Sequence, residues 1–404
     1  MDNDQNHRVL TYCDSIKKII PTTNTALWSD FLNVEANANR RVGNLENALL
    51  LHHKVLNIRL HLYGSNGLPV ANTYQNIGNC LLDSQQPDKA ITFLKKAEKI
   101  KQQFLDNHPD IASIYTSLGY AHQQKKNWTT AEKYLQKALS IKTIAAGENS
   151  VSLLPVLINL GNLNLEQAQI QTAQYYFEQG LQLQQSNYYH SNTALLFNSL
   201  GNCAAQLNQP QLALKHYQEA LRLYASKTFE VNSIQLAFVH QNIGNCYLDY
   251  ADMDEATLHY QLALSYCDQE QSPNTFYTIA NSLGLCYRYK FQFDKAIAQF
   301  ESIILQHKNV QPALLAKVYE NLANCYFDKQ SLDATAFYIN KAIATTMDDN
   351  MAHTDQARLQ LLAAKIKWQQ QETQTAVQLF DQLLRTAAPD NSFLKHNAYS
   401  ILRK

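Results

Sequence analysis

The sequence predicts an all-α protein built from a repeated pair of helices. Glycine and proline number only 11 and 9 among 404 residues, which leaves little material for the tight turns of a β protein. The hydrophobic content of 46% is ample for a helical core. A small residue, often within the tripeptide Gly-Asn-Cys, recurs every 39 to 43 residues. Recurrence at such a period is typical of a solenoid, in which each unit buries its apolar face against the next.

Aligning the chain on this small residue, which we call the anchor, gives nine units. The anchors are Ala36, Gly78, Gly119, Gly161, Gly201, Gly244, Gly284, Ala323 and Ala364. Twelve residues after each anchor stands a second small residue, which is alanine in eight units and Thr335 in the remaining one. Apolar residues around the anchors follow helical spacing, as at Ile243, Gly244 and Tyr247. Each unit therefore predicts two helices that approach closely through small residues.

The predicted elements follow in order along the chain. Residues 1–28 are too few for a helix pair, and we expect an N-terminal capping segment with one helix around Ile16 to Ile20. Residues 29–388 hold the nine helix pairs, and residues 389–404 are expected to form a C-terminal capping helix, starting near Asn391. Proline marks helix starts, because its missing N–H would be unpaired in a first turn anyway. The prolines at predicted starts are Pro69, Pro87, Pro109, Pro210, Pro273 and Pro312.

The repeated residues resemble the tetratricopeptide repeat (TPR). In that family a Leu-Gly pair is followed by Tyr, by Ala twelve residues after the Gly, and then by an aromatic residue and a further Ala. Here the pattern reads Ile243, Gly244, Tyr247, Ala256, Tyr260 and Ala263 in one unit, and Tyr319, Leu322, Ala323, Tyr326, Thr335, Ile339 and Ala342 in another. The period near 41, with HPDIA at 108–112, is similar to the longer kinesin light chain type. The resemblance implies a right-handed α-α superhelix, a TPR solenoid whose first helices line the concave face.

Charge and hydropathy argue against several kinds of partner. Lys and Arg together number 34 and balance 34 Asp and Glu, so the chain lacks the basic surface of a nucleic-acid binder or of a protein that binds anionic membranes. The amino terminus, MDNDQNHRVLTY, has no basic or apolar signal-peptide region, and no run of 18 apolar residues occurs. We therefore expect a cytoplasmic protein that contacts neither nucleic acid nor membrane.

No catalytic or metal-binding constellation is recognisable in the sequence. Motifs such as HExxH, the P-loop, GxGxxG and GxSxG are absent, and the 13 histidines are scattered. Equivalent residues on stacked helices lie about 8–10 Å apart, too far for disulfides, so we interpret the repeated cysteines as small packing residues. These are Cys80, Cys203, Cys246, Cys286 and Cys325. We expect no enzyme activity, no cofactor and no metal.

The informative pattern lies on the face expected to be concave. Two residues before the anchor, units two to eight carry Asn and Ser in alternation, and one residue after it five of the seven carry Asn. The two positions are three residues apart and share a helix face. The candidate peptide-binding residues are Asn76, Asn79, Asn159, Asn162, Asn202, Asn242, Asn245, Arg288, Asn321 and Asn324.

Two interpretations of the asparagines remain open. In the first, their carboxamides donate to and accept from the backbone of an extended peptide, about one contact for every third peptide residue. In the second, they bond between helices of the scaffold, and duplication of a two-repeat unit explains the alternation. Cations on this face are few, Lys317 and Arg288, against several carboxylates. We therefore expect a neutral or mildly basic peptide, not an acidic cargo or a C-terminal carboxylate.

The leading hypothesis is a non-enzymatic protein-protein interaction scaffold that binds an extended peptide or protein segment in its concave groove. One alternative is the sensor or regulatory arm of a bacterial CHAT-protease-type (caspase-like) system, which kinesin light chain-type repeats resemble. Another is a Rap-like regulator of signalling proteins, although 28 residues are few for the N-terminal bundle of that family. The terminal helices are the expected surfaces for any self-association.

Overall fold

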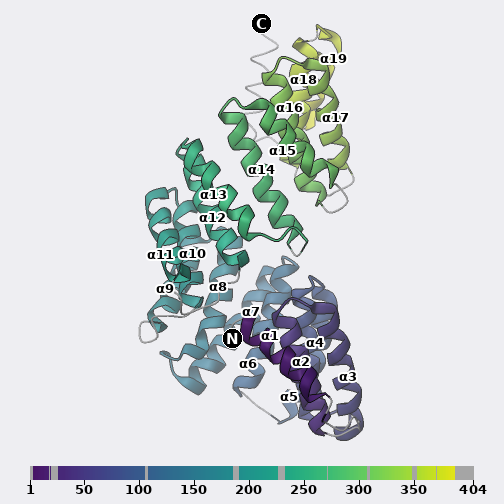
Figure 1. The fold of residues 1–404 in the computed structure, drawn as a ribbon, viewed down its shortest axis with the longest axis vertical. Coiled ribbons are helices and arrows are strands. Elements are labelled where there is room, and N and C mark those ends of the chain that lie inside the picture. The colour runs from purple at the N-terminus through teal and green to yellow at the C-terminus, as the bar shows by residue number, and fades with distance from the viewer. Residues whose placement is uncertain are drawn as a thin grey trace. The chain divides into compact units, whose positions relative to one another are not determined.

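The computed structural model consists of helices in stacked pairs (Figure 1). It describes residues 3–17, 19, 26–104, 108–184, 191–225, 233–270, 272–306, 310–347, 353–369 and 371–386. No strand occurs among these residues. The chain divides into two compact units, Met1–Asn232 and Ser233–Lys404, which are described separately below.

Unit 1 holds one N-terminal helix followed by five helix pairs. The N-terminal helix α1 spans Asn3–Ile16. The pairs are α2 (Ala26–Arg41) with α3 (Leu45–Tyr63), α4 (Leu68–Asp83) with α5 (Pro87–Phe104), α6 (Pro109–Gln124) with α7 (Trp128–Ala146), α8 (Leu154–Glu166) with α9 (Ile170–Leu183), and α10 (Ser191–Gln206) with α11 (Pro210–Ala225). A short 3₁₀ turn, η1 (Val151–Leu153), precedes α8. Within this unit each pair packs against the next one along the chain.

Unit 2 repeats the same arrangement in four helix pairs. They are α12 (Ser233–Asp249) with α13 (Met253–Tyr266), α14 (Pro273–Tyr289) with α15 (Phe293–Leu305), α16 (Pro312–Asp328) with α17 (Leu332–Met347), and α18 (His353–Gln369) with α19 (Thr373–Thr386). Over the described residues the predicted all-α solenoid of nine helix pairs is confirmed. Five of the six marked prolines are the first residue of their helix, and Pro69 is the second residue of α4.

The core lies between the two helices of each pair, where the predicted small residues stand. The small residue that stands twelve positions after the anchor is fully buried in all nine pairs, from Ala48 to Ala376 and including Thr335. The Thr335 hydroxyl donates to the Ser331 carbonyl oxygen at 2.7 Å, which satisfies the one polar atom in this series. At Gly161 an added Cβ would lie 2.4 Å from a ring carbon of Phe177, so the aromatic ring occupies the space that the missing side chain leaves.

All nine helix pairs turn at the same place, seven residues after the anchor. The residue there has a positive φ in every pair, yet it is glycine only in the first, at Gly43. The others are Gln85, Lys126, Ala168, Asn208, Ala251, Phe291, Gln330 and Gln371. In the turn after α4 the next N–H, that of Gln86, donates back to the Leu81 carbonyl oxygen at 2.8 Å. A hydrogen bond of this kind caps the C-terminal end of a helix when the residue after the helix is left-handed.

The sequence predicts one helix at each end of the chain. Helix α1 ends at Ile16, so the expectation of a helix around Ile16 to Ile20 is wrong. Asn6 and Cys13, one heptad apart, are buried, and α1 packs on α2. The C-terminal helix expected over 389–404 lies outside the described residues, and the first helix pair begins at Ala26, three residues before the predicted boundary.

Candidate peptide-binding face

The asparagines that precede the anchor lie half-buried on first helices, and two of the four bond to the preceding repeat. Asn76 donates to the Asn33 side-chain oxygen at 2.9 Å, and Asn321 donates to that of Asn281 at 2.9 Å. In both repeats the acceptor stands three residues before the preceding anchor. Asn242 also has a partner. Asn76 and Asn321 therefore link neighbouring helix pairs, as the scaffold interpretation requires.

Asn159 is the exception in this series. The residue at the acceptor position of the preceding repeat is Thr116, and its hydroxyl donates to the Ala112 carbonyl oxygen at 2.9 Å within its own helix. Asn159 consequently makes no side-chain hydrogen bond with any described residue, although it is only partly exposed. Its donors and its acceptor are therefore not used in hydrogen bonds to the described part of the chain.

The asparagines that follow the anchor show the same division. Tyr217 donates to Asn202 at 2.8 Å, and Tyr260 donates to Asn245 at 2.6 Å, each tyrosine coming from the second helix of the same pair. Asn79 instead accepts from Ser117 of the next repeat at 2.8 Å. These asparagines hold their own helix pair together or tie it to its neighbour.

Asn162 and Asn324 lack such a partner. The positions equivalent to Tyr217 and Tyr260 are occupied by Phe177 and Ile339, which have no hydroxyl. Neither asparagine makes a side-chain hydrogen bond to a described residue. Asn159 and Asn162, three residues apart on α8, therefore form a pair of unpaired carboxamides on one helix face.

This division predicts opposite effects of alanine substitution on stability. Asn245→Ala is expected to lower the free energy of unfolding by about 0.5–1.5 kcal/mol, because the buried Tyr260 hydroxyl loses an acceptor. Asn159→Ala and Asn162→Ala break no hydrogen bond, and alanine is the better helix former, so each should raise it by up to about 0.7 kcal/mol. Urea unfolding followed by circular dichroism measures the difference. Equal destabilisation by all three substitutions would show that the two unpaired asparagines are structural as well.

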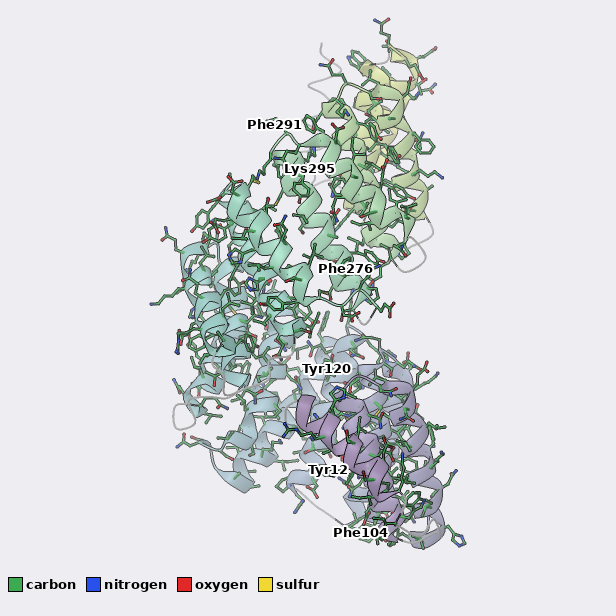
Figure 2. The ribbon with its side chains drawn as sticks, viewed as in Figure 1. Tyr12, Phe104, Tyr120, Phe276, Phe291 and Lys295 are labelled. Atoms are coloured by element: carbon green, nitrogen blue, oxygen red, sulfur yellow. The ribbon has the colours of Figure 1, made fainter. Side chains whose placement is uncertain are left out.

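A polar hollow of about 230 Å³ lies beside this pair, between first helices of unit 1. Asn79 and Asn159 both line it, together with Ser117 and the exposed Tyr120, which Figure 2 labels. Across one wall Arg40 donates to the Asp83 carboxylate at 2.9 Å. The fold thus brings two predicted residues, Asn79 and Asn159, to one hollow.

Arg40 was missed by the sequence analysis, although a signal for it exists. Arg40 stands four residues after its anchor, as Arg288 does in α14. Arg288 in turn donates to the Asp328 carboxylate at 2.7 Å, from the equivalent position of the next repeat. Each arginine is neutralised by the carboxylate of the following repeat.

Glu166 occupies the position in its repeat that is equivalent to Asp83 and Asp328, but it accepts a hydrogen bond from an uncharged side chain. Gln123 donates to its carboxylate at 2.8 Å. No described cation forms an ion pair with Glu166 or with Asp249, the equivalent residue of α12. The exposed charge of these first helices is therefore negative, which favours a neutral or basic partner segment.

The cysteines behave as packing residues. All seven are buried with free thiols, as predicted for the five that repeat. Burial raises the pKa of Cys80 to about 12 and that of Cys286 to about 11, so these thiols stay protonated and unreactive. Among the described residues no cluster of three or more histidine, cysteine or acidic side chains is arranged to hold a metal. No described helix has the length and apolar character needed to cross a bilayer.

Comparison with known proteins identifies the repeat. A family model described as tetratricopeptide repeat matches residues 30–103, 110–186 and 190–269, which is more than half of the chain. The chain is 27% identical over 135 residues to response regulator aspartate phosphatase E of Bacillus subtilis (strain 168), covering 33% of this chain and 36% of that protein. It is 24% identical over 226 residues to Protein KINESIN LIGHT CHAIN-RELATED 3 of Arabidopsis thaliana, covering 54% and 34%. The chain thus spans about a third of the length of these curated relatives.

Solved structures agree on the fold. The apo form of RapI matches with a TM-score of 0.62 at 14% identity, over 89% of this chain and 97% of that one. A Signal Transduction ATPase with Numerous Domains protein with a tetratricopeptide repeat sensor, from Pyrococcus horikoshii, matches with a TM-score of 0.61 at 15% identity, over 90% and 55%. At these identities the likeness shows the fold alone. With the family model, the nine helix pairs and their buried small residues in agreement, the chain belongs to the tetratricopeptide repeat family.

Proposed function

We propose that this protein is a non-enzymatic interaction scaffold that binds an extended segment of a protein partner along the first helices of unit 1. The observation that carries the proposal is the unpaired carboxamide pair, Asn159 and Asn162, of which Asn159 lines the polar hollow. Asparagine is a poor helix former, and here no hydrogen bond within the described protein offsets its cost. A peptide backbone supplies both the donors and the acceptors that two carboxamides can use.

The surroundings of the pair favour one kind of partner segment. Tyr120, one residue after its anchor, presents an exposed aromatic side chain at the hollow, where it would cover an apolar side chain of the bound segment. Glu166, which lies on α8 with Asn159 and Asn162, adds a negative charge that no described cation pairs with. The segment is therefore neutral or mildly basic, and it makes its main-chain contacts to α8.

A selection experiment tests this proposal. Peptides selected from a phage-displayed random library on the full chain should bind the Asn159→Ala/Asn162→Ala double variant at least about tenfold more weakly, as expected for two lost hydrogen bonds. Asn57→Ala, an exposed asparagine on α3, is the matched control and should leave the affinity unchanged. Fluorescence polarisation measures both. Retention of full affinity by the double variant, with its fold intact by circular dichroism, would contradict the proposal.

A second candidate is a sensing or regulatory arm for signalling proteins. It is favoured by the Bacillus subtilis relative, a response regulator aspartate phosphatase by name, and by the Pyrococcus horikoshii protein, whose tetratricopeptide repeats are described as a sensor. In this case the bound segment belongs to a signalling partner, and the chain acts in the cytoplasm. Incubation with a panel of phosphorylated response regulators distinguishes the two functions, since a scaffold leaves their phosphorylation half-life unchanged and a regulator of this type shortens it.

A further inference from the structure

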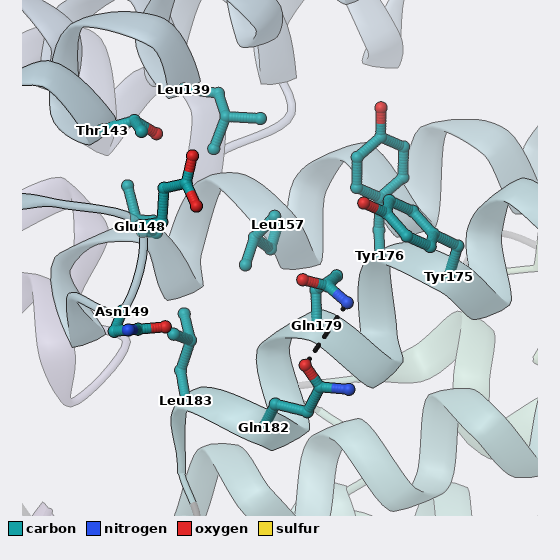
Figure 3. A pocket seen from close by; sticks show the side chains of 11 residues that line it. Leu139, Thr143, Glu148, Asn149, Leu157, Tyr175, Tyr176, Gln179, Gln182 and Leu183 are labelled. Carbon is teal, nitrogen blue, oxygen red and sulfur yellow. Dashed lines mark hydrogen bonds between the residues drawn. The ribbon is translucent and has the colours of Figure 1, made fainter.

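A second hollow, larger than the first, lies elsewhere in unit 1. It has a volume of about 540 Å³ and is enclosed by α7, the loop after α7, the start of α8, and α9 (Figure 3). Leu139, Leu157 and Leu183 form apolar walls, while Glu148, Gln179 and Tyr175 line it with polar atoms. This volume falls within the range of ligand pockets, and the mixture of leucines with a few polar groups is typical of them.

The connection between α7 and α8 creates the hollow. Helix α7 ends at Ala146 and is capped by Gly147, whose φ of 83° ends the helical backbone. The 3₁₀ turn Val151–Leu153 then delays the start of α8 to Leu154. The Lys142 ammonium donates to the Ser152 carbonyl oxygen at 2.9 Å and so fastens the loop to α7. The junction between these two repeats therefore forms the hollow.

Glu148 gives the hollow an uncompensated negative charge. It is the one charged residue of the lining, and it forms no ion pair with any described cation. Figure 3 shows its carboxylate on the α7 side of the hollow, with Leu157 between it and Gln179 in this view. The nearby ammonium of Lys142 is already bonded to the loop. A carboxylate beside apolar walls selects for a cation carried next to an apolar group.

Tyr175 adds an exposed aromatic surface at the edge. Its side chain is 57% exposed and meets Tyr176 edge-on, with ring centroids 5.5 Å apart. Tyr176 is held in place because its hydroxyl accepts from Gln136 at 2.9 Å. Large exposed aromatic residues beside a pocket are the side chains that most often dominate binding energy at protein interfaces.

We propose that this hollow is a second binding site, which accepts a protein segment with an apolar side chain between the leucines and a lysine or arginine beside Glu148. The site differs from the one under "Proposed function" and does not depend on it. Leu157, in the hollow, and Asn159 are two residues apart on α8 and so point to different sides of that helix. Two partners, or two segments of one partner, can then bind the same repeat from opposite sides.

The test uses the full chain with the first site removed. A phage-displayed random peptide library is selected on the Asn159→Ala/Asn162→Ala variant, and the enriched peptides are measured by fluorescence polarisation on three further variants of that chain. Tyr175→Ala should weaken binding about tenfold. Glu148→Gln should weaken it about threefold at low salt and have less effect at high salt. Gln171→Ala, an exposed α9 residue outside the lining, is the matched control and should change nothing.

The outcomes separate the two proposals. Enriched peptides that share an apolar residue next to Lys or Arg, and that lose affinity on Tyr175→Ala and Glu148→Gln, support the second site. If no peptide is enriched, or if the enriched peptides bind all three variants equally, the second site is wrong. The first proposal is unaffected by either result, because it is judged on peptides selected with the native chain. Circular dichroism of each variant shows whether it is folded.

Discussion

Replacing His52 by leucine is expected to raise the free energy of unfolding by about 1–3 kcal/mol at pH 7, and by more as the pH falls. His52 is fully buried in α3, and neither ring nitrogen has a hydrogen-bond partner. A buried polar atom without a partner costs about 1–3 kcal/mol. The equivalent positions of the next two repeats hold Leu94 and Leu135, so leucine fits this place in the fold.

The pH dependence follows from the charge state of the same ring. Burial first, and then the charges of Arg40, Arg59 and His53, lower the pKa of His52 from 6.5 to about 4. The native state thus holds His52 neutral, whereas the unfolded chain takes up a proton below about pH 6.5. The contribution of His52 to the free energy of unfolding is therefore constant above about pH 6.5. As the pH falls from about 6.5 to about 4, the native chain loses about 3 kcal/mol of that free energy.

Urea unfolding of the native chain and of His52→Leu at pH 7, 5.5 and 4.5 measures both effects. The advantage of the variant should grow between pH 6.5 and 4. His61→Leu, an exposed histidine on the same helix, is the control and should leave the pH dependence of the native chain unchanged. A constant difference between His52→Leu and the native chain at all three pH values would mean that the pKa of His52 is the same in the native and unfolded states. The account of its burial would then be wrong.

Phe177→Ala is expected to lower the free energy of unfolding by about 3–5 kcal/mol. The ring is fully buried and packs directly on the backbone of Gly161, where an added Cβ would lie 2.4 Å from its Cε1. For the same reason Gly161→Ala should destabilise the native chain by about 1–3 kcal/mol, because the rigid ring cannot move aside. In the Phe177→Ala background the same substitution should become stabilising, since the new methyl group enters the vacated space and alanine favours the helix.

A double-mutant cycle measured by urea unfolding tests this reversal of sign. Gly180→Ala is the control, because its added Cβ would meet only the flexible ends of Leu154 and Leu196 at 3.1 Å. That substitution should be neutral or stabilising by up to about 1 kcal/mol. Equal destabilisation of the native chain and of Phe177→Ala by Gly161→Ala would show that Gly161 is not required to make room for the Phe177 ring.

The repeat and its core could be predicted because they depend on residues that recur. Anchors, second small residues and helix-starting prolines occupy the same place in each unit, so nine copies reinforce one pattern. The turn geometry could not be predicted in this way. Residues as different as Gln85, Ala251 and Phe291 adopt the left-handed conformation that glycine normally provides, because packing of the helix pair overrides their local preference.

The candidate site shows where sequence reasoning stops. The asparagine series was visible, but which asparagines bond within the scaffold depends on residues elsewhere in the repeat. Asn245 is paired because the second helix carries Tyr260, and Asn162 is unpaired because that helix carries Phe177 in the same place. Asn159 is unpaired because Thr116 bonds within its own helix. The scaffold interpretation therefore describes the paired asparagines, and ligand contact by Asn159 and Asn162 stays a proposal.

The side-chain amide signals of asparagine test the central claim most directly. In a chain labelled with ¹⁵N at asparagine and assigned by single substitutions, a peptide selected on the native chain is titrated in and followed by NMR. The NH₂ signals of Asn159 and Asn162 are expected to shift on binding, while those of Asn202 and Asn245 stay in place, because Tyr217 and Tyr260 donate to their side-chain oxygens and so fix each carboxamide. Movement of the paired asparagines, with Asn159 and Asn162 unchanged, would contradict this claim.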